Sequence, residues 1–167
     1  VKYWMHANML TMNGARMSKS TGNYILPQEL ISGENDFFEK PFHPSVVRFN
    51  FLQAHYRSVL DISNEAMLAS EKGFQRLMEA LKTLSAISNQ QSAESGKQKA
   101  ESDFNLNSWK EKCYDALNDD FNSPILISHL FEAVSFIFKL KDGKETIAAE
   151  DLEELKTLMN AFVFDVL

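Results

Sequence analysis

The chain has 167 residues, of which 44% are hydrophobic, so it can bury a core and form one or two domains. Its formal charge of −6 argues against a protein coated in nucleic acid, although a few clustered cations could still contact RNA locally. The single cysteine, Cys113, excludes an intrachain disulfide and favours a reducing compartment such as the cytoplasm. No apolar run approaches the roughly 20 residues that span a bilayer, so no membrane contact is expected.

The first residues predict a pair of short strands. Residues 2–5 and 9–12 are apolar-rich, and Asn-Gly at 13–14 is a strong signal for a tight turn. On a strand, Trp4 and His6 would face the same side because side chains alternate. That side could lie against a nucleotide or a substrate. Alternatively, Trp4 lies in a core with His6 at its rim, and the residue pattern alone favours this second interpretation.

Residues 16–23, Arg-Met-Ser-Lys-Ser-Thr-Gly-Asn, crowd two cations and three hydroxyls around one apolar side chain, which predicts an exposed loop. Lysine supplies a mobile charge, and serine and threonine supply adaptable donors. Gly22 allows the backbone to approach a ligand closely. The loop therefore suits a polyanion, but Ser, Gly and Asn also build ordinary turns, and composition supports both interpretations equally.

Two helices are expected next. Residues 27–31 predict one to two helical turns, with Pro27 at the first position and Gly33 at the end. Ser45 then opens a helix that continues to Tyr56. This helix is apolar around most of its circumference, which indicates burial on more than one side.

Ser63 can cap a long helix that runs to about Ile87. Its apolar residues recur at steps of seven, three, four and three, which predicts a stripe facing a core. The stripe consists of Met67, Phe74, Leu77, Leu81 and Leu84. Residues 88–107 have almost nothing to bury and predict a linker or loop.

Three more helices complete the expected bundle. Residues 109–118 form a short helix in which Cys113 is a buried structural thiol. Residues 123–142 form the next, begun by Ser123 and Pro124. The last starts near residue 149, and its apolar spacing of three, four, three and four is typical of a bundle. Its stripe consists of Leu152, Leu155, Met159, Phe162 and Val166.

Asp119 and Asp120 precede the helix that starts at Ser123. They could form a metal or acid–base pair, but capping and the helix dipole explain carboxylates at this place better. No cluster of Cys, His and Glu has zinc spacing, so no metal site is expected in the chain.

Residues 16–20, Arg-Met-Ser-Lys-Ser, followed by Thr-Gly-Asn, resemble the Lys-Met-Ser-Lys-Ser signature loop of class I aminoacyl-tRNA synthetases, which closes over ATP. Tyr-Trp-Met-His at 3–6 and Asn-Gly at 13–14 resemble the cysteinyl-tRNA synthetases in particular. Asp-Ala-Leu-Asn-Asp-Asp-Phe-Asn at 115–122 resembles the start of that family's helical tRNA-binding domain. The resemblance covers nearly the whole chain and departs at Arg16, where the family has lysine.

The resemblance implies a mainly α fold, a helical bundle preceded by a small β element and the signature loop at the end of a Rossmann-type catalytic domain. It assigns residues 1–44 to the end of the catalytic domain, 45–88 to connecting helices that contact the tRNA stem, and 89–107 to a linker. Residues 108–167 would form a truncated anticodon-binding-type bundle. The chain has no initiating methionine and opens and closes in apolar segments, which predicts a piece of something longer.

The implied activity of the parent is ATP-dependent cysteine–tRNA ligation, through cysteinyl-adenylate, in a monomeric cytoplasmic enzyme. Its partners would be cysteine, tRNA(Cys) and ATP with magnesium. The zinc ion of such synthetases has its ligands before the segment present here, so the chain alone is expected to be inactive.

Several residues receive roles from the resemblance. Lys19 would be catalytic, and Trp4 and His6 would line the substrate pocket. Arg48 and Arg57 would contact tRNA, although each could equally be a solvated arginine. The ATP-binding residues would be Arg16, Met17, Ser18, Lys19 and Ser20.

Two alternatives remain open from the sequence. One is a related cysteine ligase that joins the amino acid to a small amine, which would not need a helical half that reaches an anticodon. The other is a freestanding helical interaction module without catalysis, in which the Ser-Lys loop is incidental.

Overall fold

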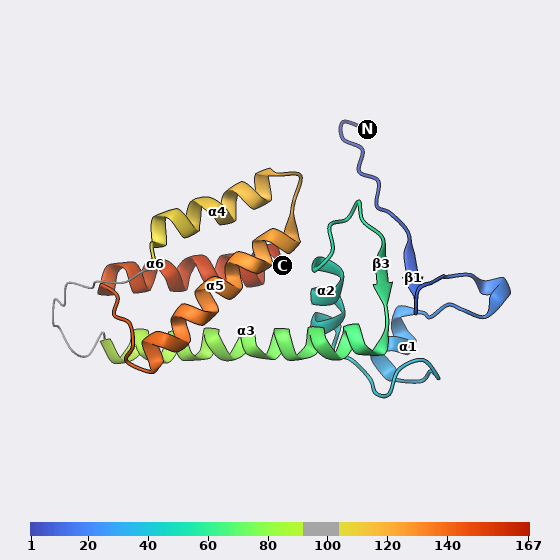
Figure 1. The fold of residues 1–167 in the computed structure, drawn as a ribbon, viewed down its shortest axis with the longest axis horizontal. Helices are drawn as coiled ribbons and strands as arrows, with labels where there is room; N and C mark the ends of the chain where they lie inside the picture. Colours follow the sequence, from blue (N-terminus) through green and yellow to red (C-terminus); the bar gives the residue numbers. More distant parts are fainter. Residues whose placement is uncertain (92–103) are drawn as a thin grey trace. The chain divides into compact units, whose positions relative to one another are not determined.

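The computed structural model describes residues 1–91 and 104–167, and the chain divides into two compact units, Val1–Phe74 and Gln75–Leu167 (Figure 1). The described residues form six α-helices and one small sheet, which confirms the mainly α fold with a small β element. The boundary between the units falls within one helix, α3 (Asn64–Gln91).

The sheet of the first unit contains β1 (Leu10–Met12), β2 (Ala15–Arg16) and β3 (Leu60–Ile62), in the order β2-β1-β3. β1 pairs antiparallel with β2 and parallel with β3. Asn13 and Gly14 connect β1 to β2 with φ angles of 52° and 74°. Two positive φ angles in a two-residue loop define a type I′ turn, whose twist matches that of the flanking strands. The tight turn is thus confirmed.

Two strand expectations were wrong. Residues 2–5 form no strand, and β1 finds its hairpin partner after the Asn-Gly turn instead. The resemblance assigned residues 45–88 to connecting helices, yet β3 lies among them. A strand of three residues has too little alternation to be detected from the sequence. Its pairing with β1 joins residues about 50 positions apart, which local patterns do not record.

Two α-helices follow the sheet's hairpin in the first unit. α1 (Pro27–Ser32) has Pro27 at its first position and ends at Gly33, as predicted. α2 (Pro44–Leu52) begins one residue earlier than expected, with the ring nitrogen of His43 accepting the Ser45 N–H at 3.2 Å. α2 also ends four residues before Tyr56, because the chain turns there toward β3.

An apolar core in the first unit joins residues of the sheet to residues of the helices. β1 and β3 each contribute one buried residue, Met12 and Ile62, and α3 contributes Met67. The buried members of this cluster are Met12, Ile25, Leu30, Phe38, Phe42, Val46, Ile62 and Met67.

α3 is capped as predicted, since the Ser63 hydroxyl accepts the Ala66 N–H at 3.2 Å. Its stripe is confirmed, with Phe74 half-buried and the other four residues buried. The helix continues past Ile87 to Gln91, so the expected linker begins too early. Most of that linker, residues 92–103, lies outside the described residues.

The second unit consists of the later part of α3 with α4 (Leu106–Asn118), α5 (Ser123–Lys141), α6 (Ala149–Asn160) and the π-helical turn η2 (Ala161–Val166). Trp109 is buried at the centre of α4, and its indole N–H donates to the His129 carbonyl at 2.7 Å. In the terminal stripe Val166 is exposed and the other members are buried, because η2 changes the helical period.

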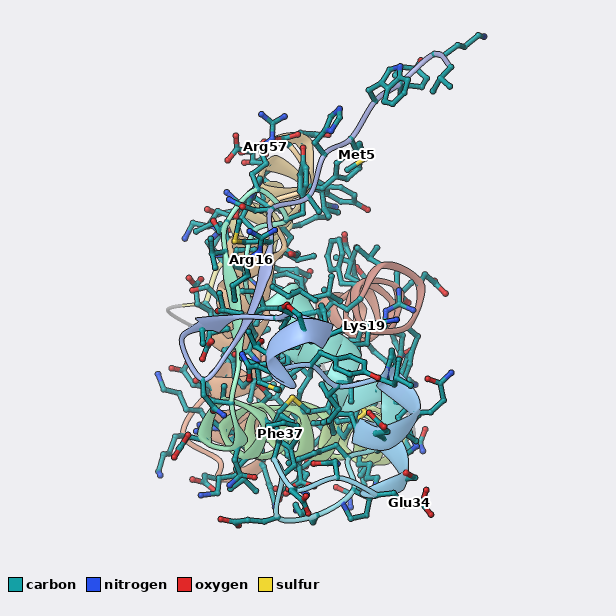
Figure 2. All side chains as sticks on the ribbon, turned by 90° about the vertical axis from the view of Figure 1, so that its right-hand side faces the viewer. Met5, Arg16, Lys19, Glu34, Phe37 and Arg57 are labelled. Carbon is teal, nitrogen blue, oxygen red and sulfur yellow. The ribbon has the colours of Figure 1, made fainter. Side chains whose placement is uncertain are left out.

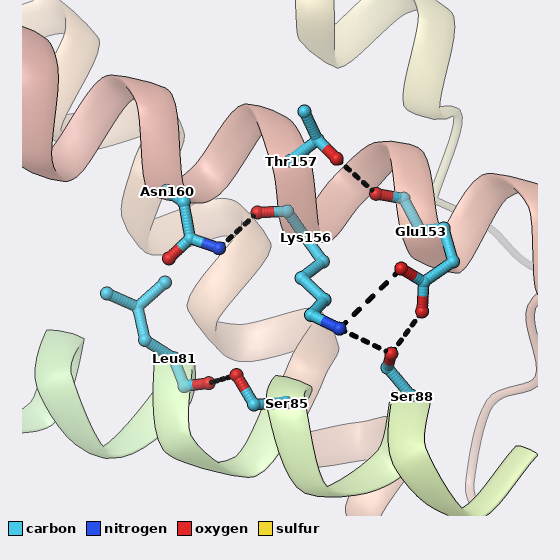
Figure 3. Close-up of polar contacts among 7 residues, drawn as sticks. All are labelled: Leu81, Ser85, Ser88, Glu153, Lys156, Thr157 and Asn160. Atoms are coloured by element: carbon cyan, nitrogen blue, oxygen red, sulfur yellow. Dashed lines mark hydrogen bonds and ion pairs between the residues drawn. The ribbon is translucent and has the colours of Figure 1, made fainter. Parts of the chain in front are cut away.

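A polar contact joins α3 to α6 inside the second unit (Figure 3). The buried Ser88 hydroxyl donates to the Glu153 carboxylate and accepts a 2.8 Å hydrogen bond from the Lys156 ammonium. The Ser88 hydrogen bond, with help from the charge of Lys156, lowers the pKa of the Glu153 carboxyl. The buried hydroxyl of Ser88 therefore has hydrogen-bond partners, as buried polar groups usually do.

α5 is the only described helix that is long and apolar enough to cross a membrane, with a mean hydropathy of 1.4 over its apolar window. Seven of its residues are buried in the second unit: Leu126, Ile127, Leu130, Ala133, Val134, Phe136 and Ile137. Burial in a helical core explains this composition.

Cys113 is fully buried on α4, and burial raises the pKa of its thiol to about 12. Because the thiolate is the reactive form, we expect a thiol reagent at pH 8 to label the folded chain far more slowly than the chain in guanidinium chloride. The chain has one cysteine, so the signal is unambiguous. Equal labelling rates in both conditions would contradict the buried assignment.

Gly33 has a φ of 79°, and a Cβ at this position would lie 2.9 Å from Pro41 Cδ. Gly33→Ala should therefore lower the free energy of unfolding by about 2 kcal/mol, through both backbone strain and a steric clash. Gly22→Ala is the matched control. Its φ is 70° and no atom lies within 4 Å of the added Cβ. The control should cost only about 1 kcal/mol. Denaturant titration measures both, and equal losses would exclude the clash.

Candidate functional site

The candidate site is the signature loop, residues 16–23, which connects β2 to the segment before α1. Ser18 and Asn23 close the loop, with the Ser18 N–H donating to the Asn23 carbonyl at 2.9 Å. Between them, η1 (Lys19–Thr21) forms a single 3₁₀ turn. Gly22 ends this turn with a φ of 70°, a conformation that glycine adopts without steric cost.

Hydroxyl groups stabilise the loop internally. The Ser18 and Ser20 hydroxyl oxygens lie 2.8 Å apart, and the Thr21 hydroxyl donates to the Ser18 carbonyl at 3.1 Å. A hydroxyl has one donor and two acceptor sites, so each serine keeps capacity for a ligand. Ser20 and Thr21 are exposed, which leaves the outer side of the loop accessible.

Met17 is the only apolar side chain of the loop, and it packs against the core of the first unit. The resemblance had placed Met17 among the ATP-binding residues. In the structure its contact is with the protein interior, so it anchors the loop while its neighbours face outward.

Arg16 and Lys19 are both exposed (Figure 2). Arg16 ends β2, directly opposite Thr11 of β1. The Lys19 ammonium lies 5.7 Å from the centroid of the Tyr24 ring, a cation–π distance. Such a contact contributes about 0.5–1 kcal/mol at an exposed site, so it orients the lysine without trapping it.

The hairpin that carries the loop is bound to β3 by a residue that the sequence analysis missed. Asp61 Oδ1 accepts hydrogen bonds from the Thr11 hydroxyl at 2.7 Å and from the Gly14 N–H at 2.8 Å. Asn13 N–H also donates to the Ile62 carbonyl at 3.2 Å. The partners of Asp61 are 47 to 50 residues away in sequence, and no local pattern indicates them.

Trp4 and His6 have stacked rings, with centroids 5.9 Å apart and planes 12° from parallel. The two rings therefore lie side by side, although the strand on which the sequence placed them does not form. Trp4 is 75% exposed, so its placement in a core is wrong for the described structure.

Arg57 lies in the turn between α2 and β3, where its Nε donates to the Tyr56 hydroxyl at 2.9 Å. Asn8 binds this turn through two hydrogen bonds of 2.9 Å, to the carbonyls of Tyr56 and Arg57. The segment that carries Trp4 and His6 is therefore joined to the turn that carries Arg57, and Figure 2 shows Arg57 beside that segment. Arg48 is exposed on α2.

In the two described stretches, no three His, Cys, Asp or Glu side chains are placed to hold a metal ion. The described residues therefore do not fit a zinc site.

The chain matches two known protein families, one in each half of its sequence. Residues 1–72 match the family described as the tRNA synthetases class I (C) catalytic domain, and residues 112–167 match the DALR domain. The signature loop, its hairpin and Asp61 all lie within the first match. The chain is thus a class I tRNA synthetase segment.

Individual relatives narrow the class. The chain is 45% identical over 167 residues to the cysteine–tRNA ligases of Parabacteroides distasonis and Bacteroides fragilis, covering 100% of the chain and 32% of each relative. It is 38% identical over 157 residues to that of Chlorobaculum tepidum, covering 93% of the chain and 28% of the relative. The chain belongs to the cysteine–tRNA ligase family, and it spans about a third of the length of the first two relatives.

Proposed function

We propose that the chain is part of an ATP-dependent cysteine–tRNA ligase and that its signature loop stabilises the ATP phosphates during cysteinyl-adenylate formation. The observation that carries this proposal is the exposed Lys19 on a 3₁₀ turn whose base is held by a hairpin and by the buried side of Met17. A loop with a fixed base and an exposed cation is suited to closing on a negatively charged ligand.

In the proposed reaction, the carboxylate of cysteine attacks the α-phosphorus of ATP, and pyrophosphate leaves. The Lys19 ammonium would stabilise the negative charge that develops on pyrophosphate as its bond breaks. Arg16 would add a second cation, and Ser18 and Ser20 would donate to phosphate oxygens. ATP enters with magnesium as a substrate.

The remaining residues extend the proposal to the other substrates. Trp4 and His6 would line the cysteine or adenosine pocket, and Arg57 and Arg48 would contact tRNA phosphates. Residues 1–44 would end the catalytic domain, 45–88 would support the tRNA stem, and 108–167 would belong to the anticodon-binding bundle. The ligase would act as a cytoplasmic monomer on tRNA(Cys).

The isolated chain should not catalyse cysteine-dependent ATP–pyrophosphate exchange. A catalytic site needs its binding groups assembled around both substrates, and the chain spans about a third of its relatives' length. The measurement compares the chain with the complete ligase at equal concentration. Exchange above background that requires cysteine would contradict this expectation.

Lys19→Ala in the complete ligase should lower the single-turnover rate of adenylate formation by about a hundredfold, with little change in cysteine affinity. Leaving-group charge is fully developed only as the bond breaks, so the lysine contributes more to the transition state than to bound ATP. Lys19→Arg should recover only part of the rate, since a planar fork cannot occupy the same point.

Arg16→Lys is the matched control, because it keeps the charge and introduces the family's usual residue at that position. Its rate should stay within about threefold of wild type. The assay uses pyrophosphatase to prevent the reverse reaction. A Lys19→Ala rate within the same threefold range would remove Lys19 from the proposed mechanism.

A further inference from the structure

Asp61 receives two hydrogen bonds on one oxygen. The Thr11 hydroxyl and the Gly14 N–H both donate to Oδ1, at 2.7 and 2.8 Å, and the side chain is half-buried on β3. Hydrogen bonds to an ionised acceptor are roughly twice as strong as neutral ones. The two donors stand on β1 and in the turn that follows it, so one carboxylate holds both ends of this short segment.

These contacts lie beside the strand that leads into the signature loop. Thr11 pairs with Asp61 on one side and with Arg16 on the other, so the three residues form one row across the sheet. β2 has only two residues, and a two-stranded ribbon of that length is not stable by itself. Without the Asp61 contacts, the turn and β2 could pivot on β1 and carry Arg16 and Lys19 with them.

We propose that Asp61 is a positioning residue for the ATP loop, acting through Thr11 and Gly14 and without touching ATP. This inference rests on the proposed function of the loop. A carboxylate that faced the triphosphate directly would repel it, whereas here the oxygen is occupied by hairpin donors. The role depends on an acceptor oxygen at one place and not on negative charge.

Two variants of Asp61 separate the need for an acceptor oxygen from the need for a negative charge. Asp61→Ala removes the acceptor and leaves the Gly14 N–H without its partner. Asp61→Asn keeps an amide oxygen that can accept both bonds, because both donors use the same atom. Asn35→Ala is the matched control in the first unit. Asn35 Oδ1 also accepts two backbone N–H groups, from Phe37 at 3.0 Å and Phe38 at 2.9 Å, in a loop outside the hairpin.

The first measurement is amide hydrogen exchange of Gly14 in the 167-residue chain. Asp61→Ala should accelerate Gly14 exchange by about tenfold, since a lost hydrogen bond of about 1.4 kcal/mol corresponds to that factor. Asp61→Asn should change it by less than about threefold, and Asn35→Ala should not change it. Unchanged Gly14 exchange in Asp61→Ala would overturn the proposal that Asp61 holds the turn, whatever the activity of the variant.

The second measurement is single-turnover adenylate formation at saturating ATP in the complete ligase. Asp61→Ala should lower the rate by about tenfold while the KM for cysteine stays the same. The reason is that displaced loop cations would stabilise the charge of the transition state less well. Asp61→Asn should restore the rate to within about twofold of wild type, and Asn35→Ala should keep it. An Asn variant as slow as the Ala variant would overturn the proposal, because the charge itself would then be required.

Failure of this inference and failure of the proposed function give different results. Faster Gly14 exchange with a normal adenylate rate in Asp61→Ala would overturn positioning by Asp61, while a hundredfold loss in Lys19→Ala would still support the loop's function. A normal rate in Lys19→Ala would overturn the function of the loop and the catalytic part of this inference together.

Discussion

The parallel pairing of β1 with β3 is the contact on which the site depends. It places Leu10, Thr11 and Met12 beside Leu60, Asp61 and Ile62. Parallel strands need a long connection, and here that connection contains β2, the signature loop, α1 and α2. The loop and the elements next to it in sequence therefore lie between two strands that pair with each other. The pairing also buries Met12 and Ile62 in the core that receives Met17.

The loop contains one residue that packs on the core and several that are exposed. Met17 packs inward, and Asp61 holds the hairpin from the side, so the base of the loop is fixed. The outer residues are exposed, and the Lys19 ammonium rests near the Tyr24 ring. That contact is worth about 0.5–1 kcal/mol, whereas a preorganised charge contact in a transition state is worth about 3 kcal/mol. Under the proposed function, this difference would allow Lys19 to leave the Tyr24 ring for a phosphate group.

The second unit is organised by packing, with few polar contacts in its core. Trp109, Cys113 and the stripe of α6 are buried, and the Trp109 N–H finds a backbone carbonyl. Ser88 is a buried polar residue of this unit that receives both a carboxylate and an ammonium partner. A bundle of this kind presents its charged residues outward, which agrees with its proposed place in a tRNA-binding domain.

Local features could be predicted from the sequence because their causes lie within a few residues. The Asn13–Gly14 turn, the limits of α1 at Pro27 and Gly33, and the stripe of α3 follow from backbone preference and helical period. The loop's family could be predicted from its residues, as the comparisons confirmed. The contacts of Lys19 with Tyr24 and of Met17 with the core required the structure. So did β3 and the hydrogen bonds of Asp61, because their partners lie about 50 residues away and meet only when β1 and β3 pair.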